Sequence, residues 1–299
     1  MVLPPVVYRD FVLDRLLDWR AAGRGTALLT LVDATGASPR PVGSQMAVND
    51  AGESLGLITG GCAEGALIHD TLDAMAKGQS RTEIYGEGSR YMDIRLPCGS
   101  GLKVRIEIEP DEAALRAVLA ARQARRLSKL EIDTGEGVYV RHYRPECRLV
   151  VAGRGPIVGA LTQLAPVVEM AAVVYSPDSV MPSDSDALTA LPLRSPQDFD
   201  GADLDAFTAL ILLFHDHSFE PDILAKGLCS EAFYIGALGS RKAHAQRLET
   251  LSAMGFSPSD LARIDGPAGL PIGARTPPEI ALSILARAVA GWREDMAGV

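Results

Sequence analysis

The stretch that decides the fold of the second half of the chain is Leu149-Val150-Val151-Ala152-Gly153-Arg154-Gly155-Pro156-Ile157-Val158-Gly159. Its apolar start predicts a buried strand, and the glycine-rich turn that follows predicts the beginning of a helix. In dinucleotide-binding proteins such a turn lets a pyrophosphate approach the N-terminus of the helix. The match is imperfect, because Val158 occupies the position of the usual third glycine and Gly159 comes one residue late.

Strands and helices alternate after this turn. Apolar runs predict three further buried strands, at 171–175, 209–214 and 233–236. This alternation is typical of a parallel sheet with helices on both faces, so residues 146–299 are predicted to form a Rossmann-like, doubly wound domain. Ser176, and not an acid that could hold a ribose, follows the strand at 171–175. NAD(P) binding of the ordinary kind is therefore not expected.

The first half of the chain has a different pattern. Short apolar or alternating runs predict five strands, at 26–33, 44–49, 53–58, 92–96 and 102–108. Helices are expected at about 5–22, after Cys62 and at 111–127, and residues 131–146 predict a short strand and a connector. Residues 1–145 are therefore predicted to form an α+β domain with mixed or antiparallel strands, with the domain boundary near Pro145.

A cysteine lies in the tightest turn of this first domain. The stretch Leu57-Ile58-Thr59-Gly60-Gly61-Cys62-Ala63-Glu64-Gly65 runs from an apolar strand into a helix, and its two adjacent glycines free the backbone for a sharp turn. Backbone N–H groups at a helix start are unpaired and carry partial positive charge. The Cys62 thiol should therefore ionise readily and act as a nucleophile or as a ligand for a soft metal or sulfur species. A small buried hydrophobe is the equal alternative.

Two other loops of the first domain carry candidate residues. Cys98 lies in Pro97-Cys98-Gly99-Ser100-Gly101, a second cysteine flanked by glycine, for which a simple turn residue is the alternative. Arg40 lies in Ser38-Pro39-Arg40-Pro41-Val42-Gly43, where the prolines fix extended backbone. Its guanidinium is either a solvated charge or an anion clamp.

In the second domain, candidate residues follow the predicted strands, whose carboxyl ends face the binding crevice of such folds. His215-Asp216-His217 could bind a metal or move protons, and a structural turn is the equal alternative. The turn Gly239-Ser240-Arg241-Lys242 predicts an anion site. The alternative is that Ser240 caps the helix and the two charges are solvated. Thr276 and Glu279 form a predicted capping box, which leaves Arg275 free to face the crevice.

Composition bounds the class of protein. The chain has 299 residues, 47% of them hydrophobic and 22% charged, and a formal net charge of −9, which argues against a general nucleic-acid binder. Its four cysteines are far apart with no C-x-x-C pair, a poor pattern for zinc or for a disulfide framework. With no leader and no apolar run of membrane-spanning length, the chain is expected to be cytoplasmic, with reduced thiols and no membrane partner.

Taken together, these pieces resemble the XdhC/CoxI family, the accessory proteins of xanthine dehydrogenase and related molybdenum hydroxylases. Six blocks in the family's order carry the resemblance over nearly the whole chain: 38–43, Gly60-Gly61-Cys62-Ala63-Glu64, 97–101, 215–217, 236–242 and 272–280. Two departures, Val158 in the glycine-rich turn and Ser176 after the next strand, weaken the expectation of nucleotide binding.

The resemblance implies a role that composition cannot show. Members of this family look like carriers that bind the molybdenum cofactor (molybdopterin), assist its sulfuration by a cysteine desulfurase, and deliver it to an apo molybdenum hydroxylase. It therefore favours a cofactor-binding chaperone over a catalyst and leaves open whether the protein itself catalyses sulfuration; a homodimer is compatible with it.

The resemblance also implies which residues hold the cofactor. Cys62 is implied to contact the molybdenum or its sulfur, since this soft centre suits a thiolate. The turn Ser240-Arg241-Lys242 of the second domain is implied to bind the phosphate of the cofactor. We expect the thiol and this cationic turn to hold the cofactor between them. The implied cofactor-binding residues are Arg40, Gly60, Gly61, Cys62, Glu64, Cys98, Gly153, Gly155, His215, Asp216, His217, Gly239, Ser240, Arg241, Lys242 and Arg275.

Two other classes of protein stay open at this point. The first is an NAD(P)-dependent oxidoreductase that uses the C-terminal Rossmann-like domain. The second is a thiol-redox protein that works through Cys62 and Cys98, which would form a disulfide on mild oxidation.

Overall fold

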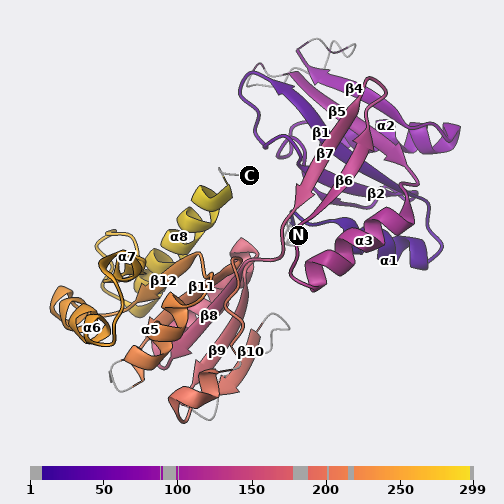
Figure 1. Ribbon diagram of the computed structural model, residues 1–299. Helices are drawn as coiled ribbons and strands as arrows, with labels where there is room; N and C mark the ends of the chain where they lie inside the picture. The colour runs from indigo at the N-terminus through magenta and orange to yellow at the C-terminus, as the bar shows by residue number, and fades with distance from the viewer. Residues whose placement is uncertain are drawn as a thin grey trace, which may run out of the picture. The chain divides into compact units, whose positions relative to one another are not determined.

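The structure is a computed structural model that describes residues 9–87, 89, 99, 101–177, 188–200, 202–214 and 219–296. The chain divides into two compact units, Met1–Pro145 and Glu146–Val299 (Figure 1). Within the described residues, no helix is both long and apolar enough to cross a membrane.

The first unit is built on a five-stranded antiparallel sheet, which agrees with the predicted fold class. Its strand order is β3-β2-β1-β5-β4. The strands are β1 (Thr26–Thr35), β2 (Gln45–Asn49), β3 (Ser54–Gly56), β4 (Arg81–Gly86) and β5 (Gly101–Ile108). The predicted hairpin of β2 and β3 is confirmed. Strand β5 pairs with β1 on one side and with β4 on the other, and the strand predicted at 92–96 lies outside the described residues.

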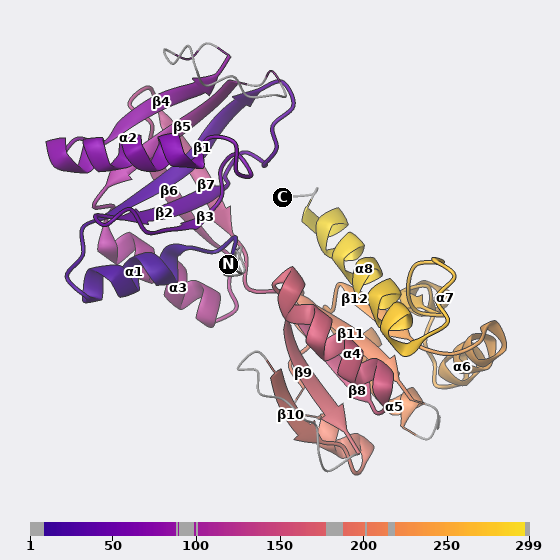
Figure 2. The ribbon, with the colours of Figure 1, turned by 180° about the vertical axis from the view of Figure 1, so that it is seen from behind.

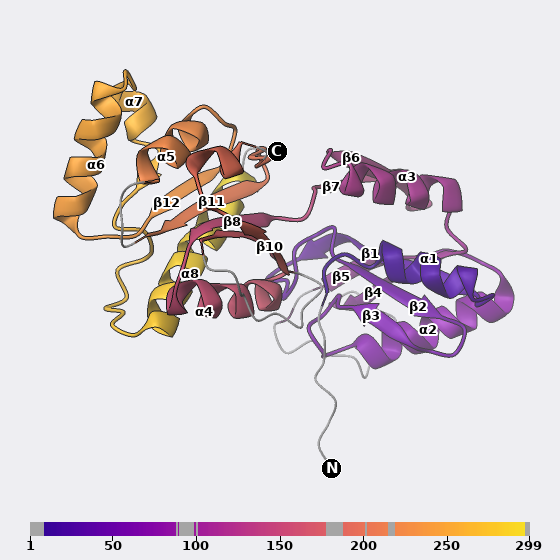
Figure 3. The ribbon, with the colours of Figure 1, turned by 90° about the horizontal axis from the view of Figure 1, so that it is seen from below.

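Both faces of this sheet are covered (Figures 2 and 3). Leu29 and Leu31 of β1 pack with residues of α2 (Glu64–Lys77), whereas Leu28 packs on the other face. That second face meets α1 (Leu13–Ala21), α3 (Glu112–Gln123) and a two-stranded hairpin of β6 (Ser128–Asp133) and β7 (Val138–Tyr143). The prediction of a short strand and a connector at 131–146 was therefore only partly correct, because the segment contains a second strand, β7. The helix predicted at 5–22 begins only at Leu13.

Three loops leave the same end of this sheet. Strand pairing places Gln45 opposite Thr30, and Gly56 opposite Met46, so β1 and β3 end where β2 begins. Gly101 pairs with both Thr35 and Gly86, so β4 ends and β5 begins at that end as well. The connections that carry Arg40, Cys62 and Cys98 therefore start from the same end of the sheet.

The second unit is a doubly wound parallel sheet, as the fold class predicted, with strand order β10-β9-β8-β11-β12-β13. Its strands are β8 (Arg148–Gly153), β9 (Ala171–Ser176), β10 (Leu188–Pro192), β11 (Thr208–Leu213), β12 (Tyr234–Ala237) and β13 (Ile264–Asp265). The order reverses between β8 and β11. The carboxyl ends of these two strands are where open parallel sheets bind ligands.

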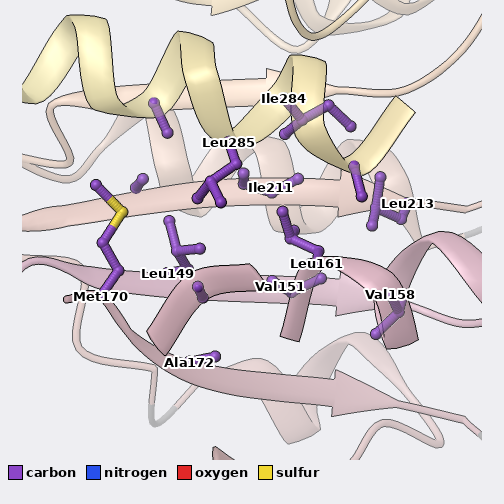
Figure 4. Packing of buried hydrophobic residues seen from close by; sticks show 14 of the residues in the cluster. Leu149, Val151, Val158, Leu161, Met170, Ala172, Ile211, Leu213, Ile284 and Leu285 are labelled. Atoms are coloured by element: carbon purple, nitrogen blue, oxygen red, sulfur yellow. The ribbon is translucent and has the colours of Figure 1, made fainter. Parts of the chain in front are cut away.

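Helices cover both faces of this sheet. Helices α4 (Pro156–Leu164) and α8 (Pro277–Met296) pack on one face, where their apolar side chains meet those of β8 and β11 (Figure 4). Helices α5 (Glu220–Leu228) and α6 (Arg241–Ala253) contribute to the core on the other face, and the short α7 (Pro258–Leu261) follows α6.

Candidate functional site

Cys62 lies in an exposed loop between β3 and α2, and its thiol is free. The two residues before it, Gly60 and Gly61, have φ values of 76° and 111°. Such left-handed backbone is strained for residues with a side chain, which explains the double glycine. The alternative of a buried hydrophobe at Cys62 was wrong. A cysteine two residues before a helix, at the surface, can meet a ligand from solvent.

The conformation of this loop is fixed by Glu64, the first residue of α2. Its Oε1 accepts the backbone N–H of Thr59 at 2.7 Å and that of Ile58 at 3.2 Å. Its Oε2 accepts the N–H of Gly61 at 2.7 Å and the hydroxyl of Thr59. Burial acts to raise the pKa of Glu64, but these hydrogen bonds outweigh it and the pKa lies below its ordinary value. Glu64 therefore holds its own loop as a carboxylate.

Thr59 was missed by the sequence analysis. Its side chain is buried, and its hydroxyl accepts the N–H of Ala63 at 2.9 Å while it donates to Glu64. The N–H groups on either side of Cys62 are thus both bonded within the loop. The signal available in the sequence is a hydroxyl before the double glycine and a carboxylate at the start of the helix.

Arg40 already has a carboxylate partner. Its Nη2 lies 2.6 Å from Asp10, which also lies 4.0 Å from Arg141 of β7. The Arg40 side chain is 24% exposed, so it is neither a freely solvated charge nor an open anion clamp. Cys98, the other cysteine candidate of this unit, lies outside the described residues.

In the second unit the two glycines of the dinucleotide-type turn have different surroundings. A Cβ at Gly153 would lie 2.4 Å from the carbonyl oxygen of Leu213, so this glycine lets β8 and β11 approach. Gly155, with a φ of 93°, has open space beside it. The next residue, Pro156, has no N–H to offer a phosphate, and Val158 is fully buried in the core.

A pocket of about 170 Å³ lies at this turn, at the carboxyl ends of β8 and β11. Its lining is mostly apolar, from Arg154, Pro156, Ile157, Leu213, Leu238 and Pro277. Ser176 at the end of β9 is buried. The predicted His215, Asp216 and His217 follow β11 and lie outside the described residues.

The turn before α6 presents two cations. Ser240 accepts the N–H of Ala243 at 3.1 Å and caps the helix. Arg241 and Lys242 are exposed, with no ion-pair partner among the described residues. Arg275 is likewise exposed, and Glu279 accepts the N–H groups of residues 275 and 276 at 2.8 and 2.9 Å; the bond from Thr276 is the carboxylate half of the predicted capping box. These cations are available to an anion, while the serine has a structural role.

A buried ion pair behind this turn was also missed. The Arg247 guanidinium lies 2.8 Å from Glu220, and both side chains are 3% exposed. Arg247 also donates to the carbonyl of Leu238 at 2.9 Å, so the pair ties the start of α5 to the turn before α6. The partners are 27 residues apart in the sequence, and they meet only when the second unit is folded.

Among the described residues, no group of three or more His, Cys, Asp or Glu side chains could hold a metal ion.

Fold and site define a class: a protein that joins an antiparallel α+β unit, with an exposed cysteine before a helix, to a Rossmann-type unit. Residues 19–86 match the XdhC and CoxI family, and residues 149–287 match the XdhC Rossmann domain. The chain is 34% identical over 281 residues to the molybdenum cofactor insertion chaperone PaoD of Escherichia coli, covering 89% of this chain and 83% of that protein. It therefore belongs to the XdhC and CoxI family.

Two more distant similarities agree with this assignment. A protein of Bacillus subtilis described as a probable xanthine dehydrogenase subunit is 24% identical, over 93% of this chain and 96% of that one. A crystal structure described as a xanthine dehydrogenase from Bacillus halodurans has a TM-score of 0.77 at 23% identity and covers 94% of this chain and 96% of that one. The latter similarity establishes the fold.

Proposed function

We propose that this protein is an accessory protein of molybdenum enzyme maturation. In this proposal it binds the molybdenum cofactor in the cytoplasm, assists its sulfuration by a cysteine desulfurase, and delivers it to an apo molybdenum hydroxylase of the xanthine dehydrogenase type. The 34% identity to an insertion chaperone supports the class of function. The observation that carries the chemistry is the free, exposed Cys62 in a loop of fixed conformation.

The chemistry of the cofactor fits the residues present. Molybdenum bound by sulfur is soft and suits a thiolate ligand, which Cys62 can supply from the surface of the first unit. The cofactor also carries a phosphate, and Arg241 and Lys242 beside the start of α6 offer charge-assisted hydrogen bonds to such a group. We assign Cys62 to the molybdenum or its sulfur, and the α6 turn to the phosphate.

The test is cofactor loading without oxygen. Purified protein is incubated with released molybdenum cofactor, separated by gel filtration, and its molybdenum and pterin are measured. Cys62→Ala is expected to retain much less cofactor than the wild type. Cys229→Ala, which removes another exposed free cysteine in the second unit, is the matched control. Equal loading of the wild type, Cys62→Ala and Cys62→Ala/Cys98→Ala would refute the thiol role.

The rival NAD(P)-dependent oxidoreductase makes a different prediction. It requires tight binding of NADH or NADPH at the turn of Gly153 and Gly155, which fluorescence titration measures directly. The absent N–H at Pro156 and the buried Val158 argue against a pyrophosphate at this turn. Tight binding of either nucleotide would favour the rival over cofactor handling.

A further inference from the structure

The hydrogen-bonding capacity of the Glu64 carboxylate is already used. A carboxylate offers about four lone-pair positions. Glu64 accepts the N–H groups of Ile58, Thr59 and Gly61 and the hydroxyl of Thr59. A residue whose oxygens are bonded within its own loop has little left to offer a bound cofactor.

The direction of these bonds separates them from ordinary helix capping. A capping side chain satisfies N–H groups of the first helical turn. The Glu64 carboxylate instead reaches back to residues 58–61, before the helix begins. The interaction therefore orders the loop and not the helix, and the part of the loop that it orders ends next to Cys62.

We propose that Glu64 is a positioning residue for Cys62: together with Thr59 it holds the glycine-rich loop in the one conformation that sets the reactivity of the thiol. Two adjacent glycines would otherwise give this loop great conformational freedom. Glu64 fixes the N–H of Gly61, and Thr59 fixes that of Ala63, so the backbone is held on both sides of the cysteine. The consequence for cofactor binding rests on the proposed function, but the effect on the thiol does not.

The experiment measures alkylation of Cys62 by iodoacetamide, followed by mass spectrometry of the peptide that contains it, across pH 6–9. The reference is the same protein unfolded in urea. Glu64→Gln removes the charge and one acceptor oxygen, and Glu64→Asp keeps the charge but is one methylene too short to span the loop. Thr59→Val removes the hydroxyl, and Thr59→Ser keeps it. Glu53→Gln is the matched charge control, because Glu53 accepts a 2.6 Å bond from Asn49 in the β2–β3 turn.

We expect the wild-type rate to differ severalfold from the unfolded rate, because the backbone on both sides of the thiol is held in the folded protein and is free in urea. Both Glu64 variants and Thr59→Val should move most of the way to the unfolded rate. Thr59→Ser and Glu53→Gln should stay near the wild type. Agreement between the two Glu64 variants assigns the effect to loop geometry, since only one of them loses the charge.

Three results would overturn the inference: a wild-type rate equal to the unfolded rate, unchanged alkylation in both Glu64 variants, or a change in Glu64→Gln without one in Glu64→Asp. Amide hydrogen exchange at Thr59 and Gly61 gives a second reading, since exchange there should quicken about tenfold in Glu64→Gln. Failure of the proposed function is visible elsewhere, as absent cofactor loading of the wild-type protein.

Discussion

The hydroxyl of Tyr85 donates a 2.6 Å hydrogen bond to the carboxylate of Asp70, and both side chains are buried. This bond joins β4, whose end leads to the segment of Cys98, to α2, whose start follows Cys62. Arg81 at the beginning of β4 adds a 3.0 Å bond to the carbonyl of Asp70. The helix behind the cysteine loop is thus tied to the edge strand by polar contacts within an apolar core.

Tyr85→Phe should destabilise the first unit by about 1–3 kcal/mol, because it removes a buried hydrogen bond to a charged group. Urea unfolding followed by fluorescence measures this. The chain has two tryptophans, and Trp292→Phe leaves Trp19 as the reporter of the first unit. Tyr139→Phe is the control, since its hydroxyl has no hydrogen-bond partner among the described residues. Equal loss of stability in both variants would contradict the importance of the bond.

The ion pair of Glu220 and Arg247 leads to a larger prediction. Arg247→Met should cost the second unit about 3–5 kcal/mol, because it leaves Glu220 charged and unpaired in the interior. Fluorescence of Trp292 in a Trp19→Phe background reports the unfolding of this unit. Replacing both partners, with Glu220→Leu and Arg247→Met, should recover most of the stability. If the double variant is no more stable than the single one, the cost is not that of an unpaired charge.

The two glycines of the Rossmann turn should respond differently to alanine. Gly153→Ala places a Cβ against the Leu213 carbonyl and should cost about 3 kcal/mol. Gly155→Ala has open space, so it should cost less than Gly153→Ala: only the strain of a backbone conformation (φ 93°, ψ −172°) that is essentially restricted to glycine, of the order of 1–3 kcal/mol. Thermal unfolding followed by Trp292 compares them. Similar costs would mean that Gly153 is not needed for the approach of β8 to β11.

The elements that were predicted from the sequence are those with strong local signals. Strands β1, β5, β8 and β11 are apolar or alternating runs that pack in the cores of the two units, and Glu279 accepts the N–H of Thr276 at the start of α8, where the sequence predicts a capping box. Strand β4 was not predicted, because its sequence Arg81–Gly86 contributes only one fully buried side chain, that of Tyr85. The β6–β7 hairpin was only partly predicted for a similar reason.

The site was predictable in its residue types more than in its contacts. Cys62 and the two glycines before it follow from backbone chemistry, which is local. The Glu64 carboxylate was expected to face a cofactor, whereas the fold turns it onto Thr59 and Gly61. The partners of Arg40 and Arg247 lie 30 and 27 residues away, so no local pattern indicates them.

The contributions of Glu64 and Glu107 to the stability of the first unit should change with pH in opposite directions. The pKa of Glu64 is lowered in the folded loop, so its carboxylate stabilises the fold above the ordinary glutamate pKa of about 4.3, and this contribution is lost as the pH falls through the folded-state pKa. Burial raises the pKa of Glu107 in the folded protein. Its ionisation therefore destabilises the folded state as the pH rises above the ordinary glutamate pKa.

Urea unfolding of the first unit at pH 3 and pH 7 tests both signs. Glu64→Gln should be less stable than the wild type at pH 7 and close to it at pH 3. Glu107→Gln should be more stable than the wild type at pH 7, and again the gap should close at pH 3. The same sign for both variants would contradict the environments described for these carboxylates.

Anion binding at the start of α6 should depend on its two exposed cations, Arg241 and Lys242. Arg241→Gln/Lys242→Gln should weaken the binding of inorganic pyrophosphate about tenfold at low ionic strength, because exposed charge pairs are worth up to about 1 kcal/mol each. The wild-type affinity itself should fall as salt screens these charges. Titration calorimetry of the whole protein at 20 and at 200 mM salt measures both effects. Lys77→Gln/Lys129→Gln, which removes the same charge from exposed positions of the first unit, is the control. Equal weakening by the two double variants would show that net charge, and not the α6 turn, attracts the anion.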